Sequence, residues 1–146
     1  MFGGASSADN LDYVRPESES SEPAVVLVVE DEAAVRMFCC TVLRRFGYEV
    51  LEAPGPVEAL DTLQHKAVGL VLTDITMPGM NGKEMVKRID RGQQPDLKVL
   101  YMSGYSENLE PGLDFLEKPF TSADLLKRVR AALDANRSVR LQADVL

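Results

Sequence analysis

The central segment of this chain is Val71-Leu72-Thr73-Asp74-Ile75-Thr76-Met77-Pro78-Gly79-Met80-Asn81-Gly82. An apolar run leads to one carboxylate, and a turn rich in proline and glycine follows it at once. This order predicts that Asp74 lies at the carboxyl end of a buried strand, the edge where open α/β sheets bind ligands. A carboxylate there is also a common turn residue that bonds to its own backbone. Asp74 alone leaves both interpretations open.

Length and composition indicate one globular domain with short tails. The chain has 146 residues, of which 45% are hydrophobic and 27% charged, and it holds no apolar run long enough to span a bilayer. The N-terminus lacks the basic and apolar segments of a secretion signal, so the expected location is cytoplasmic, with no membrane partner. The net charge of −7 argues against a nucleic-acid partner, because phosphate binding needs clustered lysine and arginine.

The composition divides the chain into three parts. Residues 1–23 are predicted to form an acidic, flexible N-terminal tail, because they hold four of the seven net negative charges and a run rich in serine, proline and glutamate. Residues 24–135 are predicted to form the domain. Residues 136–146 are predicted to extend the last helix or to form a tail.

Strand and helix patterns alternate along the domain. Short apolar runs predict strands at residues 25–29, 49–53, 68–73, 98–103 and 114–117. Apolar side chains three and four apart predict helices over 32–46, from 57 to about 65, around 85–89, and onward from a cap at Thr121 or Ser122. In the second helix, Val57, Leu60 and Leu63 are expected to face inward. This alternation favours a parallel sheet with helices on both faces.

The two cysteines, Cys39 and Cys40, are neighbours on the first predicted helix. Adjacent helical side chains point about 100° apart, which argues against a disulfide between them. They are interpreted as reduced, structural thiols.

Four of the predicted strands end in polar or charged side chains. Glu30 and Asp31 follow the first strand, Asp74 the third, Ser103 the fourth and Lys118 the fifth. In a doubly wound parallel sheet these ends share one edge. Three carboxylates there would repel one another unless a divalent cation joined them, and hard oxygen ligands suit Mg²⁺. With a lysine and a hydroxyl beside them, such a site suits phosphoryl transfer with a carboxylate as the possible nucleophile.

The order of these motifs resembles the receiver domains of two-component response regulators. The resemblance covers roughly residues 25–133 and rests on four segments: Val28-Val29-Glu30-Asp31-Glu32, Leu72 to Gly82, Tyr101-Met102-Ser103-Gly104-Tyr105 and Phe115-Leu116-Glu117-Lys118-Pro119-Phe120. It implies an α/β, flavodoxin-like fold, a doubly wound parallel five-stranded sheet of order 2-1-3-4-5. It also implies a signalling phosphoacceptor that catalyses only its own phosphoryl uptake and slow autodephosphorylation.

The resemblance assigns a role to each motif residue. Asp74 would accept a phosphoryl group from a phosphohistidine on a sensor histidine kinase or a histidine phosphotransfer domain. Asp31 would bind Mg²⁺ (or Mn²⁺) directly, with Glu30 helping through water and the backbone carbonyl of Thr76 completing the ligands. The remaining implied roles are a switch formed by Ser103 and Phe115, phosphoryl binding by Lys118 with a cis Lys118-Pro119 peptide, and tuning of dephosphorylation by Thr76 and Tyr105.

One departure from the family pattern concerns the fourth helix. Between Ser103 and Lys118 the chain is about seven residues, or two helical turns, short. The fourth helix is therefore expected to be shortened or absent, and the downstream target is left open. The wording of the Ser103 and Lys118 motifs is most similar to receivers of hybrid sensor kinases.

Three alternatives use similar residues. A dehalogenase-type phosphatase also has a strand-end aspartate, but it needs a second carboxylate two residues later, where this chain has Thr76. A flavin-binding module needs a phosphate loop after the first strand, where Glu30, Asp31 and Glu32 would repel a phosphate. A degenerate receiver acting only as an interaction surface is disfavoured, because Asp31, Asp74, Ser103 and Lys118 are all present.

Overall fold

The computed structural model describes residues 24–104 and 113–145, with side chains through Asp134. Strands and helices alternate along most of this length. The elements are β1 (Val25–Val29), α2 (Ala33–Arg45), β2 (Glu49–Ala53), α3 (Pro56–His65), β3 (Leu70–Asp74), α4 (Gly82–Lys87), β4 (Lys98–Ser103), β5 (Phe115–Glu117) and α5 (Ser122–Val145).

The five strands form one parallel sheet in the order β2-β1-β3-β4-β5. This confirms the predicted doubly wound, flavodoxin-like α/β fold. The register pairs Val29 with Thr73, and Asp74 with Met102, so β1, β3 and β4 end at nearly the same level. Ser103 pairs with Glu117, which brings the residue before Lys118 to that level as well. The carboxyl ends of four strands therefore share one edge.

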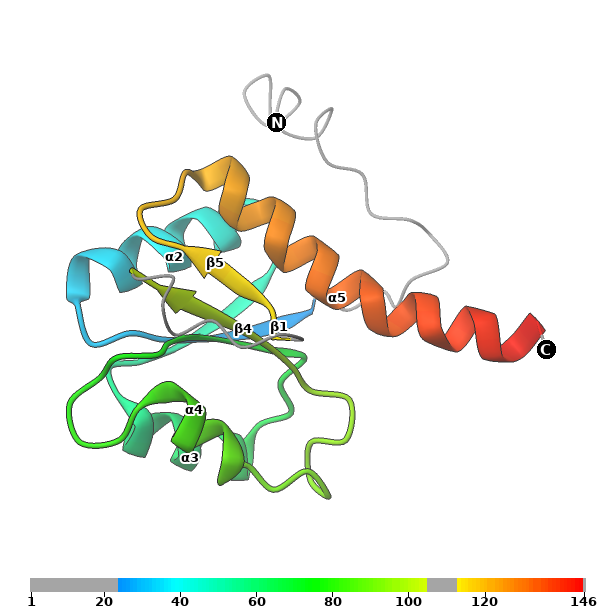
Figure 1. Cartoon of the computed structure of the whole chain (residues 1–146), viewed down its shortest axis with the longest axis horizontal. Helices are drawn as coiled ribbons and strands as arrows, with labels where there is room; N and C mark the ends of the chain where they lie inside the picture. The colour runs from blue at the N-terminus through cyan, green and yellow to red at the C-terminus, as the bar shows by residue number, and fades with distance from the viewer. Residues whose placement is uncertain (1–23, 105–112, 146) are drawn as a thin grey trace, which may run out of the picture.

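Helices cover both faces of the sheet, α2 and α5 on one side and α3 and α4 on the other (Figure 1). Alternate strand residues supply the two cores, because successive side chains point to opposite faces. Val26 and Val28 pack with Cys39, Leu43 and Leu125 under α2 and α5. The intervening strand residues pack against α3 and α4, and this second core includes Leu27, Val29, Ala59, Leu63, Val71 and Met85.

Side-chain caps fix the starts of two helices. Asn81 Oδ1 accepts from the Glu84 N–H at 2.8 Å and the Glu84 carboxylate accepts from the Asn81 N–H at 3.2 Å, so α4 begins with a capping box. At α5, Thr121 Oγ1 accepts from the Asp124 N–H at 3.1 Å. This confirms Thr121 as the cap of the last helix. Each such cap satisfies helix-end donors that have no partner within the helix.

Three local predictions from the sequence were wrong. Val57 is 70% exposed, because α3 begins at Pro56 and buries Pro56 and Ala59 in its place, while Leu63 is buried as predicted. The third strand begins at Leu70 rather than Val68, whose N–H donates to the Gln94 side chain at 3.2 Å. The helix expected around residues 85–89 spans Gly82–Lys87.

The expected shortening of the helix between Ser103 and Lys118 falls on residues 105–112, which lie outside the described residues. The last helix continues past residue 135 to Val145 and projects beyond the sheet (Figure 1). Among the described helices, none combines the length and the apolar character required to cross a bilayer.

The two cysteines are free, as the sequence predicted, and they are buried on the inner side of α2. Burial raises the pKa of the Cys39 thiol to about 12 and that of the Cys40 thiol to about 11. The thiolate is the reactive form, so both groups stay protonated and inert at neutral pH.

We expect iodoacetamide at pH 8 to leave the folded protein unmodified and to alkylate both thiols once denaturant unfolds it. Stability should also fall as the pH rises above about 9, because thiols of the unfolded chain then lose protons that the folded chain retains. Rapid alkylation of the native protein, followed by mass spectrometry, would contradict this assignment.

Candidate functional site

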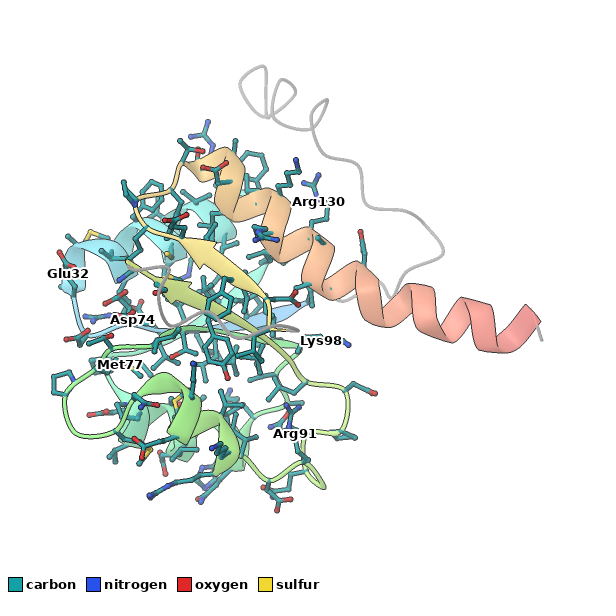
Figure 2. The ribbon with its side chains drawn as sticks, in the orientation of Figure 1. Glu32, Asp74, Met77, Arg91, Lys98 and Arg130 are labelled. Carbon is teal, nitrogen blue, oxygen red and sulfur yellow. The ribbon has the colours of Figure 1, made fainter. Side chains whose placement is uncertain are left out.

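Three carboxylates meet at the carboxyl edge of the sheet. One oxygen each of Glu30, Asp31 and Asp74 can be chosen so that all three lie within 4.8 Å of one another. Glu30 and Asp74 are buried, at 1% and 7% exposure, whereas Asp31 is exposed. Figure 2 shows Asp74 and Glu32 at the same end of the sheet, opposite Lys98 at the start of β4. The predicted convergence of Glu30, Asp31 and Asp74 is therefore present in the fold.

Lys118 joins this cluster from the end of β5. Its Nζ donates to Glu30 Oε1 at 2.9 Å and lies 3.3 Å from Asp74 Oδ2. Burial alone would lower the pKa of Lys118. The hydrogen bond to Glu30 and the charge of Asp74 outweigh burial, so its pKa lies above the usual value and the ammonium stays charged. The Lys118-Pro119 peptide is cis, as the resemblance implied.

Each polar group of Glu30, both in the backbone and in the side chain, makes a hydrogen bond. Its N–H donates to the Ala53 carbonyl at 3.1 Å, and its own carbonyl accepts from Arg36 Nη1 at 2.7 Å. Carboxylate oxygen Oε2 accepts from the Glu32 N–H at 3.0 Å, while Oε1 accepts from Lys118. Burial raises the pKa of Glu30, although the hydrogen bond from Lys118 opposes that rise.

Ser103 ends β4 beside the cluster and is 7% exposed. Its carbonyl accepts from the Lys118 N–H at 2.8 Å, which ties the ends of β4 and β5 together. Thr76, two residues after Asp74, is exposed in the loop that follows β3. Tyr105, the other residue expected near the site, lies outside the described residues.

Phe115 begins β5 as a buried ring. It packs with Ile75 and Tyr101, and the Tyr101 and Phe115 ring centroids are 5.8 Å apart. Ile75 directly follows Asp74, and its N–H donates to the Met102 carbonyl at 3.1 Å. A small apolar cluster therefore connects the backbone at Asp74 with the start of β5.

Gly82 brings the loop after β3 back onto Asp74, a contact that the sequence analysis missed. Its N–H donates to the Ile75 carbonyl at 2.7 Å. A Cβ at this position would collide with the Asp74 carbonyl and come within 3.2 Å of Ile75 Cα. The only sequence signal is a glycine after the helix-capping Asn81, and that signal does not identify what the backbone approaches.

Arg36 was also missed. It lies six residues after Glu30 on α2, where the helical pattern marks it only as a polar position. Its guanidinium binds the Glu30 carbonyl and lies 3.4 Å from Glu52 Oε1 at the end of β2. Neither contact has a motif that could have identified it.

The site combines the carboxylate oxygens of Glu30, Asp31 and Asp74 with the ammonium group of Lys118. Carboxylate oxygens are preferred ligands of Mg²⁺, and an ammonium beside a carboxylate can bind an incoming anion. The site can therefore hold a divalent cation and a phosphoryl group around one buried carboxylate, Asp74.

Comparison with known proteins identifies the family of this chain. Residues 26–130 match the response regulator receiver domain. The sensor kinase CckA of Brucella abortus is 35% identical over 130 residues, which cover 83% of this chain but only 14% of that kinase. The response regulator receiver protein CpdR of Brucella abortus is 33% identical over 117 residues, covering 75% of this chain and 97% of CpdR.

Solved structures agree. The receiver domain of the hybrid histidine kinase CckA is 39% identical, with a TM-score of 0.67, and the match covers 75% of this chain and 99% of that one. The chemotaxis response regulator CheY4 of Vibrio cholerae is 29% identical, with a TM-score of 0.71 and coverage of 76% and 99%. The chain belongs to the response regulator receiver domain family of two-component systems.

Proposed function

We propose that this chain accepts a phosphoryl group on Asp74 from a phosphohistidine of a histidine kinase or histidine phosphotransfer domain. One observation carries the proposal: Asp74, buried at the end of β3, lies 3.3 Å from Lys118 and clusters with Glu30 and Asp31. In the reaction, an Asp74 oxygen attacks the phosphorus, and a P–O bond forms as the P–N bond breaks. The imidazole leaves with the electron pair and then takes up a proton.

A divalent cation suits this site, because three carboxylates lie within 4.8 Å of one another and the single ammonium of Lys118 cannot balance all three charges. Asp31 and Asp74 would hold Mg²⁺ (or Mn²⁺) directly, with Glu30 through water and the Thr76 backbone carbonyl as a further ligand. When bound, Mg²⁺ neutralises charge on the phosphoryl oxygens. Lys118 and the Ser103 hydroxyl would bind the remaining phosphoryl oxygens.

The new charge would drive the conformational change. A phosphoryl group adds nearly two negative charges and three strong acceptors, which attract the nearest ammonium and hydroxyl. Movement of Ser103 toward Asp74 would leave space that the Phe115 ring, packed on Ile75 and Tyr101, can follow. Thr76, exposed beside the nucleophile, and Tyr105 would tune the access of the water that ends the signal.

The assignment of Asp74 is tested by intact mass. Wild-type protein incubated with Mg²⁺ and acetyl phosphate should gain the mass of one phosphoryl group, and chelation of the metal should prevent the gain. Asp74→Asn, which keeps the shape of the side chain, should gain nothing. No adduct on the wild type, or an equal adduct on the variant, would overturn the proposal.

A partner surface lies next to the site. Phe38 on α2, 40% exposed, contacts Phe120 through tilted rings whose centroids are 6.1 Å apart, and Met37 beside it is 66% exposed. Phe120 follows Lys118-Pro119 directly, so this apolar surface borders the acidic cluster. Exposed apolar patches with a polar rim often mark protein-interaction sites. We propose that the phosphohistidine protein docks here.

Phe38→Glu should slow phosphoryl transfer from a phosphorylated histidine phosphotransfer protein by at least about 5-fold, because loss of a hot-spot residue costs more than about 1 kcal/mol. Uptake from acetyl phosphate should not change, since the small donor needs no docking surface. Val57→Glu is the matched control, because Val57 is 70% exposed on α3, on the other face of the sheet. Equal transfer by both variants would exclude this surface.

This function suggests a role for each of the three parts of the chain. Residues 24–135 would form the receiver domain, residues 1–23 an acidic tail, and residues 136–146 an extension of α5. The CckA likeness suggests a role like that of a receiver within a hybrid kinase. The small-donor assay on the full chain, compared with residues 24–135 alone, tests whether the flanking segments alter uptake.

A further inference from the structure

Arg36 contacts the acidic turn from the first part of α2. Its Nη1 donates to the Glu30 carbonyl at 2.7 Å, and its own backbone N–H donates to the Glu32 carbonyl at 3.0 Å. The side-chain bond holds the turn directly before Asp31, whereas the backbone bond belongs to the first turn of α2 and would remain in any variant. We propose that Arg36 is a positioning residue for the divalent-cation site, an inference that rests on the function proposed above.

The argument depends on one peptide unit. The carbonyl of Glu30 and the N–H of Asp31 belong to the same rigid plane, so a bond to that carbonyl fixes the direction in which the chain enters Asp31. Glu30 has its own side-chain anchors in Lys118 and the Glu32 N–H. Asp31 is exposed, and its direction depends far more on the backbone that carries it.

The guanidinium is itself held in place. Arg36 Nε lies 3.4 Å from Glu52 Oε1, and Glu52 Oε2 lies 3.5 Å from Arg44 Nη2, which also donates to the Val50 carbonyl at 3.1 Å. Glu52 lies near the end of β2. Arg36 therefore spans the ends of β1 and β2 with two separate nitrogens, Nη1 toward the Glu30 carbonyl and Nε toward Glu52. The rigid guanidinium fork holds these two donors apart, whereas an ammonium carries all of its donors on one nitrogen.

Positioning of Asp31 by Arg36 should strengthen Mg²⁺ binding, whereas the positive charge of Arg36 should weaken it. A positive side chain next to the site repels Mg²⁺, so its removal strengthens binding if charge is all that matters. Its role in positioning predicts weaker binding instead, because residues that orient metal ligands typically contribute 10- to 100-fold to metal affinity. The sign of the change separates the two effects.

The test measures Mg²⁺ affinity of the full chain by isothermal titration calorimetry, without a phosphodonor. We expect Arg36→Met to bind Mg²⁺ about 10-fold more weakly, and Arg36→Lys, which keeps the charge but not the fork, to bind it several-fold more weakly. Arg44→Met is the matched control, because it removes the other arginine on Glu52 without touching the acidic turn. Its Mg²⁺ affinity should equal that of the wild type.

A second readout separates positioning from a general structural role. With acetyl phosphate as donor, Arg36→Met should need about 10-fold more Mg²⁺ for half-maximal phosphorylation, yet reach nearly the wild-type rate at saturating Mg²⁺. Urea unfolding of each variant without metal shows whether the fold survives. If Arg36→Met does not fold, Arg36→Lys decides.

Each outcome has a distinct meaning. Tighter or unchanged Mg²⁺ binding by Arg36→Met or Arg36→Lys would overturn the positioning role while leaving the cation site intact. An equal loss in Arg44→Met would also overturn it, because the effect would then come from Glu52 and the helix rather than from the acidic turn. Absence of Mg²⁺ binding by the wild type would instead refute the proposed cation site itself.

Discussion

Lys118→Met is expected to slow phosphoryl uptake from acetyl phosphate by at least about 100-fold, the usual effect of removing one preorganised charge from a transition state. The reason is local. Lys118 Nζ lies 2.9 Å from Glu30 Oε1 and 3.3 Å from Asp74 Oδ2, and methionine keeps the length of the side chain without its charge. The rate of adduct formation, followed by intact mass at saturating Mg²⁺, measures the effect.

The same variant should also lose about 3 kcal/mol of stability in metal-free buffer at pH 7, because it leaves the Glu30 carboxylate buried without its cation. Glu30 already has a pKa raised by burial, and loss of Lys118 would raise it further. The penalty applies to the charged form, so it should shrink as the pH falls through that raised pKa. It should vanish below 4.5, where the unfolded chain is protonated as well.

A double variant separates stability from chemistry. Glu30→Gln removes the buried charge, so Lys118→Met with Glu30→Gln should regain most of the lost stability in urea unfolding while uptake stays slow. Recovery of uptake along with stability would mean that Lys118 serves only to balance Glu30.

Gly82→Ala is expected to lower the free energy of unfolding by about 3 kcal/mol, at the upper end of overpacking effects, because the obstructing atoms belong to the backbone. The new Cβ would collide with the carbonyl of Asp74 and approach Ile75 Cα to 3.2 Å. Relief of that collision must shift either α4 or Asp74. We therefore expect slower phosphorylation in the fraction that remains folded.

Gly104→Ala is the control for this change. Gly104 follows Ser103 at the same edge of the sheet, and among the described residues a Cβ there meets no atom within 4 Å. Its unfolding free energy should stay within about 0.5 kcal/mol of the wild type. Equal urea midpoints for Gly82→Ala and wild type would contradict the prediction, because the loop after β3 would then move to accept the Cβ at little cost in free energy.

Strand ends were the predictable part of this molecule. Apolar runs that stop at Glu30, Asp74 and Ser103 define parallel strands, and parallel strands must bring their carboxyl ends to one edge. The convergence of Glu30, Asp31, Asp74 and Lys118 therefore followed from the alternation of strands and helices, whereas the strand order was implied only by the resemblance to receiver domains. The resemblance to receiver domains added the roles of the residues, which spacing does not contain.

Contacts made through space were not predictable in the same way. The bond from Arg36 to the Glu30 carbonyl ends on a backbone atom that every residue has, so no pattern marks it. Gly82 matters because of how closely it approaches Asp74, and the sequence shows only a glycine in a turn. The inward position predicted for Val57 was wrong for a simpler reason. Because α3 begins at Pro56, its buried face includes Pro56 and Ala59, each one residue before the position predicted to be buried.

The position of the phosphoryl group tests the proposed function most directly. Wild-type protein phosphorylated with acetyl phosphate and Mg²⁺ can be treated with borohydride, which reduces an acyl phosphate to an alcohol and releases phosphate. Peptide mass mapping should then find homoserine in place of Asp74 and no other modified residue. Reduction at Asp31 or Glu30, or a phosphate that survives borohydride on His65 or a hydroxyl, would contradict Asp74 as the acceptor.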